Sequence, residues 1–109
     1  YHSYYKYYVF INPDALRPSW NRDLVVEALN RAGVPCNTGS CPEIYRENAF
    51  KTVSFRLQDA VMDDGEGRLP VARQLGETSI MFMVHPTLTP ESIDYFIDQV
   101  RQVMEEAAK

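Results

Sequence analysis

Apolar residues are concentrated in two short runs that predict β-strands. Residues 5–12 are rich in tyrosine, valine, phenylalanine and isoleucine. This run ends at Asn12-Pro13-Asp14, because proline cannot donate a ladder hydrogen bond and the two flanking residues favour a turn. Residues 79–84 form the second run, which His85-Pro86 closes. Both faces of the first strand become apolar toward its middle, so we expect a cover on each side, one of them from another domain.

Two longer segments have the three- and four-residue spacing of apolar positions that is typical of an amphipathic helix. The first starts after Asn21, a capping residue, and stops at Gly33. The second starts at Thr89, which precedes a proline at the first helical position. Its single apolar stripe consists of Ile93, Phe96, Ile97, Val100, Val103, Met104 and Ala107. A shorter helix is predicted over residues 70–75, ending at Gly76.

The segments between these elements are less regular. Residues 34–36 have room for a short strand, and residues 37–42 form a loop of small residues. Residues 43–50 allow one or two helical turns. Residues 52–62 fit neither the spacing of apolar positions in a helix nor that in a strand. The acidic, glycine-containing residues 63–67 predict an exposed, mobile turn.

The order of these elements predicts an α+β fold, an open α/β two-layer sandwich. Its sheet is small and mainly antiparallel, with about three strands, and the helices pack on one face. Each long helix has one apolar stripe to bury, and a sheet of this size offers surface for two such stripes. A length of 109 residues predicts one domain.

Composition excludes several classes of protein. Hydrophobic residues make up 45% of the chain, which is enough for a core and argues against intrinsic disorder. The net charge of -4 provides no broad basic field, so we expect neither nucleic acid nor a membrane surface as a partner. The longest apolar runs fall far below the roughly 20 residues of a spanning helix. The chain opens on Tyr1 with no signal-peptide pattern, and we expect a piece of a longer protein.

The two cysteines, Cys36 and Cys41, are too few for a disulfide framework and are not spaced like the ligands of a zinc knuckle. We expect them to stay reduced in a cytoplasmic setting. The glycines form no phosphate-binding loop, and no nucleophile elbow is present. A small hydrolase or metal protein built on Cys36, Cys41 and His85 remains an alternative.

Residues 39–45 are the strongest candidate for a ligand-binding lip. They combine a flexible glycine, a rigid proline and the side chains of Ser40, Cys41, Glu43 and Tyr45. The alternative is an ordinary connection with Glu43 in solvent and Tyr45 packed.

Two further side chains are candidates for binding. Lys6 is an ammonium group among tyrosines at a strand start, where it suits a phosphate or carboxylate, although an exposed edge lysine fits equally well. His85 follows a strand, from whose end a side chain often reaches a crevice. The alternative for His85 is a histidine that ties down the turn through one ring nitrogen.

Five blocks of the chain carry a family resemblance in their order. They are YKYYVFI at 5–11, NRDL to AGV at 21–34, SCPEIY at 40–45, LPVA to LG at 69–76 and VHPTLT at 84–89. Together they resemble the C-terminal small domain of the DegT/DnrJ/StrS aminotransferases, which are pyridoxal-phosphate enzymes of fold type I that aminate nucleotide-linked keto-sugars. The resemblance spans nearly the whole chain. It departs at residues 40–43, where many members have a histidine- and proline-rich segment, which leaves the keto-sugar and the amino donor open.

The resemblance implies that the catalytic groups lie elsewhere. The Schiff-base lysine, the aspartate beside the pyridine nitrogen and the phosphate cup belong to an N-terminal large domain, and none of Lys6, Lys51 and Lys109 lies in a Schiff-base motif. Pyridoxal phosphate is therefore expected in the full-length enzyme, a homodimer, and not on this fragment, which is catalytically incomplete. The substrate-binding residues expected on this domain are Ser40, Cys41, Glu43, Tyr45, Lys6 and His85. A stand-alone, non-catalytic module of the same fold that binds a ligand or a partner is the alternative.

Overall fold

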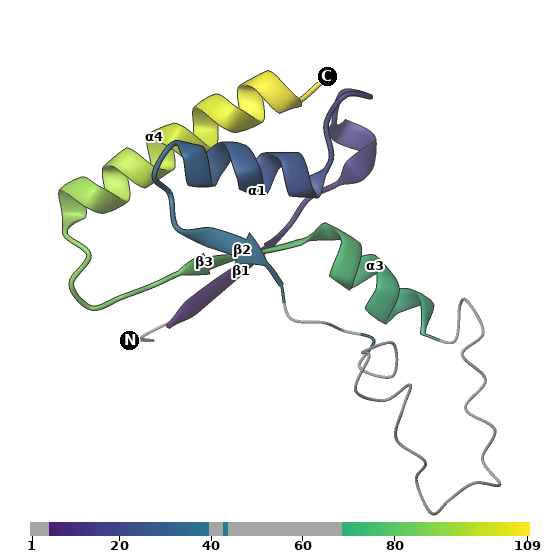
Figure 1. The fold of residues 1–109 in the computed structure, drawn as a ribbon, viewed down its shortest axis with the longest axis horizontal. Coiled ribbons are helices and arrows are strands. Elements are labelled where there is room, and N and C mark those ends of the chain that lie inside the picture. Colours follow the sequence, from purple (N-terminus) through teal and green to yellow (C-terminus); the bar gives the residue numbers. More distant parts are fainter. Residues whose placement is uncertain (1–4, 40–42, 44–68) are drawn as a thin grey trace, which may run out of the picture. The chain divides into compact units, whose positions relative to one another are not determined.

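The computed structural model describes residues 5–39, 43 and 69–109, and the chain divides into two compact units. Residues 1–39 and 78–109 form the first unit, and residues 40–77 form the second. The elements of the first unit are β1 (Lys6–Phe10), the 3-10 helix η1 (Pro13–Ala15), α1 (Arg22–Arg31), β2 (Cys36–Thr38), β3 (Ser79–Met83) and α4 (Pro90–Ala107) (Figure 1). Helix α3 (Pro70–Thr78) belongs to the second unit except for its last residue.

The first unit is built on a three-stranded sheet in the order β1-β3-β2, and both outer strands pair antiparallel with β3. Val9 lies opposite Ile80, and Phe82 lies opposite Tyr7 on one side and Cys36 on the other. The predicted α+β class, with about three antiparallel strands, is confirmed.

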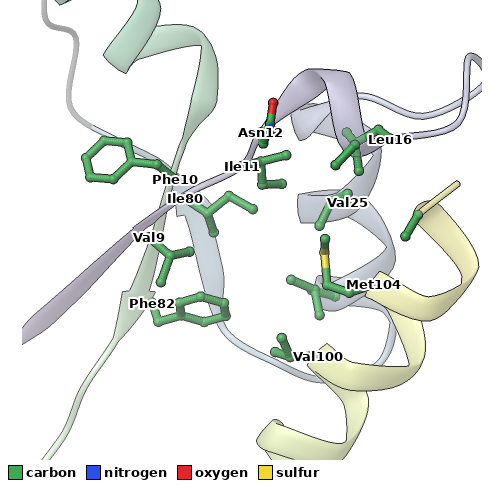
Figure 2. Close-up of a pocket in the computed structure, with 13 residues that line it drawn as sticks. Val9, Phe10, Ile11, Asn12, Leu16, Val25, Ile80, Phe82, Val100 and Met104 are labelled. Carbon is green, nitrogen blue, oxygen red and sulfur yellow. The ribbon is translucent and has the colours of Figure 1, made fainter.

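The core lies between one face of the sheet and the helices α1 and α4. Val9, Ile80 and Phe82 point from the strands toward these helices, whereas Phe10 points away on the other side of the sheet (Figure 2). The buried apolar residues are Ile11, Leu16, Val25, Leu29, Val34, Cys36, Ile80, Val103 and Ala107. Strand alternation therefore gives the sheet one face on the core and one face away from it.

The helix ends follow the predicted capping residues. The side chain of Asn21 accepts a hydrogen bond of 2.9 Å from the Leu24 N–H at the start of α1. Gly33 follows this helix with a φ of 81°, a left-handed conformation that favours glycine. The Thr89 hydroxyl accepts from the Ser92 N–H at 3.2 Å at the start of α4. These three predictions are confirmed.

Three predicted boundaries are wrong. Helix α3 does not stop at Gly76 but runs to Thr78, since a single glycine costs a helix only about 1 kcal/mol and an Arg73–Glu77 ion pair at 2.9 Å spans the same turns. Strand β2 begins only at Cys36 and continues to Thr38, where we expected a loop. Its residues pair with the edge of β3, a contact that local sequence does not reveal. Strand β1 ends two residues early, at Phe10.

Long-range hydrogen bonds connect α4 and the residues after it to other parts of the first unit. Arg17 N–H donates to the Ala107 carbonyl at 2.9 Å, and Lys109 N–H donates to the Ala15 carbonyl at 3.1 Å. The Tyr95 hydroxyl donates to the Ala32 carbonyl at 2.8 Å, which joins α4 to the end of α1. Among the described residues no helix is long and apolar enough to cross a membrane. The elements predicted over residues 44–67 lie outside the described residues.

Candidate functional site

The structure brings two of the predicted site residues, Lys6 and His85, to the same end of the sheet. Lys6 is the first residue of β1 and lies opposite Met83, the last residue of β3. The Val84 N–H donates to the Tyr5 carbonyl at 3.1 Å, which continues this pairing past the strands. His85 follows directly. Two basic side chains from sequence positions far apart therefore share one end of the sheet.

Lys6 is half-buried, and its Nζ lies 5.2 Å from the centroid of the Tyr5 ring. A cation over an aromatic face at this distance is stabilised by about 0.5–1 kcal/mol at an exposed site. The contact restricts the ammonium group without neutralising its charge. The binding of a phosphate or carboxylate by Lys6 stays a prediction.

His85 ties down the turn after β3. Its Nδ1 lies 2.7 Å from the Thr87 hydroxyl and accepts a hydrogen bond of 3.3 Å from the Thr87 N–H. This geometry is the turn-fixing role described above as the alternative. Because Nδ1 accepts from a backbone N–H, the hydrogen-bond network assigns the proton of the neutral ring to Nε2. Nε2 is therefore the nitrogen that this arrangement offers as a donor.

Of the predicted lip at residues 39–45, Gly39 and Glu43 lie among the described residues, and Glu43 is the one proposed to bind. It is 6% exposed, so the alternative in which Glu43 points into solvent is wrong. A carboxylate is stable at this degree of burial only where hydrogen bonds or an opposite charge hold it. Ser40, Cys41 and Tyr45 lie outside the described residues, and Glu43 belongs to the second unit. Its role in binding stays a prediction.

Cys36 is a buried, free thiol of the core. Its Sγ lies 3.8 Å from the Val26 carbonyl oxygen, and burial raises the pKa of the thiol. A thiol in this setting is a packing residue rather than a nucleophile. In residues 5–39, 43 and 69–109, no three histidine, cysteine, aspartate or glutamate side chains converge to hold a metal ion.

The described lysines do not fit a pyridoxal phosphate site. Lys6 lies at the sheet end, and the Nζ of Lys109 donates to the Asp14 carbonyl at 2.8 Å at the end of the chain. A Schiff-base lysine needs a desolvated pocket or a second cationic group to become a nucleophile. The first unit has an apolar cavity of about 420 Å³ in its core and an apolar groove of about 450 Å³, and neither lysine lines either of them. Lys51 lies outside the described residues.

One surface of the first unit was missed by the reasoning from sequence. An apolar groove of about 450 Å³, the β1–α4 groove, runs between β1 and the first half of α4. Its lining includes Tyr7, Phe82, Leu88, Ile93, Phe96 and Ile97. Tyr7 is 51% exposed, Ile93 45% and Ile97 50%. The prediction that the α4 stripe is buried is therefore wrong for Ile93 and Ile97, whereas Phe96 of the same stripe packs against the core. The lengths of the two helices could have indicated this uncovered surface, since α4 has 18 residues and α1 has only 10.

Comparison with solved structures finds an aminotransferase. The chain is similar to the aminotransferase from Psychrobacter cryohalolentis, known from its X-ray structure, with 43% sequence identity and a TM-score of 0.80. The similarity covers 98% of this chain but 25% of the aminotransferase, so the chain spans about a quarter of that protein's length. No protein-family model and no curated protein matches the chain. The fold of the chain is that of a small domain of an aminotransferase.

Proposed function

We propose that this chain is the C-terminal small domain of a pyridoxal-phosphate-dependent aminotransferase that moves an amino group from an amino acid to a nucleotide-linked keto-sugar. The observation that carries the proposal is 43% identity over 98% of the chain to part of an aminotransferase. The DegT/DnrJ/StrS resemblance supports the sugar-nucleotide substrate, the N-terminal large domain, the homodimer and a cytoplasmic location. The cofactor supplies the electron sink of transamination when bound in the full-length enzyme.

The share of this domain in that activity is to form a wall of the substrate cleft. Lys6 and His85 lie at one end of the sheet, and a cation and a ring N–H suit the diphosphate of a nucleotide sugar. Ser40, Cys41, Glu43 and Tyr45 are the further substrate-binding residues that the family resemblance implies for this domain. No proton transfer or covalent step is assigned to residues 1–109.

The full-length enzyme tests this proposal. We expect it to bind pyridoxal phosphate, to accept an amino group from an amino acid, and to pass the group to a nucleotide-linked keto-sugar in preference to a simple keto acid. Lys6→Met should raise the KM for the nucleotide sugar about tenfold, the cost of one charge-assisted hydrogen bond, with little change in kcat. Lys109→Met is the matched control, because its ammonium group is bound to the Asp14 carbonyl.

Two results would contradict the proposal, and a third would remove one residue from it. A gene that encodes only these 109 residues would favour the stand-alone binding module. A full-length enzyme that aminates simple keto acids and ignores nucleotide sugars would remove the substrate class. An unchanged KM in Lys6→Met would remove Lys6 from the substrate wall and leave the rest standing.

A further inference from the structure

The β1–α4 groove exposes apolar side chains that the core does not use. Ile93 and Ile97 lie one turn apart on α4 and line the groove with Tyr7 of β1, and each of the three is about half exposed. Further along the same helix, Val103 and Ala107 are buried. Phe96, which lies between Ile93 and Ile97 in the sequence, packs against the core. The stripe is therefore buried toward the end of the helix and partly uncovered, at Ile93 and Ile97, near its start.

The groove is built for an apolar occupant. None of the described residues that line it is charged, and the carboxylate of Asp98, next to Ile97 in the sequence, is paired with Arg101 at 3.1 Å. A second cavity of about 420 Å³ adjoins it and shares Val9, Phe82 and Val100 with it (Figure 2). Contiguous exposed apolar surface of this kind marks a site of contact with a protein, a membrane or a ligand.

We propose that the β1–α4 groove seats an apolar segment of the same enzyme chain, from the part outside residues 1–109. The inference rests on the proposed function, which supplies that part, and on the match to one quarter of an aminotransferase, which leaves about three quarters of such a chain to provide the segment. The groove is then a joint between this domain and the rest of the enzyme.

Shape favours this occupant over a second copy of the domain. In a two-fold contact the same patch meets itself, and a concave patch against a concave patch leaves a void. Interiors are packed to a density that does not tolerate such voids. A head-to-tail contact between copies leads to rings or filaments rather than to a simple dimer. A convex segment of the same chain fills the groove without either cost.

Cysteine labelling of the full-length enzyme tests whether the groove is covered. Ile97→Cys places a thiol in the groove, and Gln102→Cys places one on an exposed position of the same helix outside it. Each is treated with a maleimide, and the modified peptides are quantified by mass spectrometry in the native enzyme and in urea. We expect native labelling of Ile97→Cys to be at least about tenfold slower than that of Gln102→Cys, because it must wait for local opening. Equal native rates would overturn the proposal.

Photo-crosslinking from p-benzoylphenylalanine at position 97 identifies the occupant. A product that runs as one chain and links position 97 to a peptide outside residues 1–109 supports the proposal. A product that joins two chains within residues 1–109 overturns it in favour of a second copy. The transamination assay separates the two claims, since an active aminotransferase with a freely labelled Ile97→Cys refutes the groove assignment alone.

Discussion

Leu29 is the residue on which the packing of α1 can be tested most directly. Its side chain is 0% exposed and belongs to the core between the sheet and the helices. Replacing a fully buried leucine by alanine costs about 2.7–5.0 kcal/mol, from lost transfer free energy and from the cavity that remains. Leu29 already lines the cavity of about 420 Å³, so one side of it lacks close neighbours. We therefore expect Leu29→Ala to lower the free energy of unfolding by about 3 kcal/mol.

Leu24→Ala is the matched control. Leu24 lies on the same helix and is 41% exposed, so the substitution removes the same atoms and changes the same helix propensity. Because part of its surface already meets water, the expected cost is below about 1 kcal/mol. The comparison isolates burial from every other effect of the change.

Urea unfolding of the 109-residue chain, followed by far-UV circular dichroism, measures both variants against the wild type. The wild type must show one cooperative transition, and the slope m must stay constant across the three proteins for the midpoints to report stability. Costs for Leu29→Ala and Leu24→Ala that agree within about 0.5 kcal/mol would refute the position of Leu29 in the core.

Three further predictions concern backbone space and titration. Gly39→Ala should destabilise the chain by about 1–3 kcal/mol, because the new Cβ would lie 2.9 Å from Ser79 Cβ. In urea melts, combining it with Ser79→Gly should remove most of this cost. If the effects of the two substitutions on the free energy of unfolding simply add, the clash is contradicted. The Cys36 thiol should resist Ellman's reagent until the chain unfolds, and fast labelling of Cys36 at neutral pH would contradict this. Because burial raises the pKa of the Cys36 thiol, the folded state should lose stability above pH 9.0, as the pH rises through the folded pKa. The backbone N–H of Glu91 and the Thr89 hydroxyl lower the pKa of the Glu91 carboxyl. The contribution of this carboxylate to the stability of the fold is therefore present above its unfolded pKa and is lost as the pH falls through its folded pKa. In an NMR titration, Thr89→Ala should raise the Glu91 pKa, and an unchanged pKa would exclude the hydroxyl as a cause.

Local patterns predicted the elements whose cause is local. Helix α4 was located because Thr89 and Pro90 specify its start and its apolar positions follow one stripe. The extension of β2 to Thr38 was not predictable in this way, because it depends on pairing with β3, which lies about forty residues further along the chain. Antiparallel pairing at this separation leaves no periodic trace in a segment of three residues.

The residues of the candidate site also differ in whether local sequence could predict their structure. The turn-fixing role of His85 was accessible from the His-Pro sequence, since a histidine at a strand end has backbone N–H groups within reach. The burial of Glu43 was not accessible, because an acidic residue in a loop of small residues reads as exposed. Periodicity also assigned Ile93 and Ile97 to a buried stripe without showing what covers them. A stripe predicts a contact, and the partner in that contact need not belong to the same domain.

Strand β1 connects the two proposals made for this domain. Successive side chains of a strand point to opposite faces, so Tyr7, which lines the groove, and its neighbour Lys6 leave the strand on opposite sides. Among the described strands, β1 lies at the edge of the sheet and pairs with β3. A segment seated on Tyr7 would hold that end of β1 against α4 and would thereby fix the position from which the Lys6 ammonium group extends. Filling of the groove on one face of the sheet would thus set the geometry of substrate binding on the other.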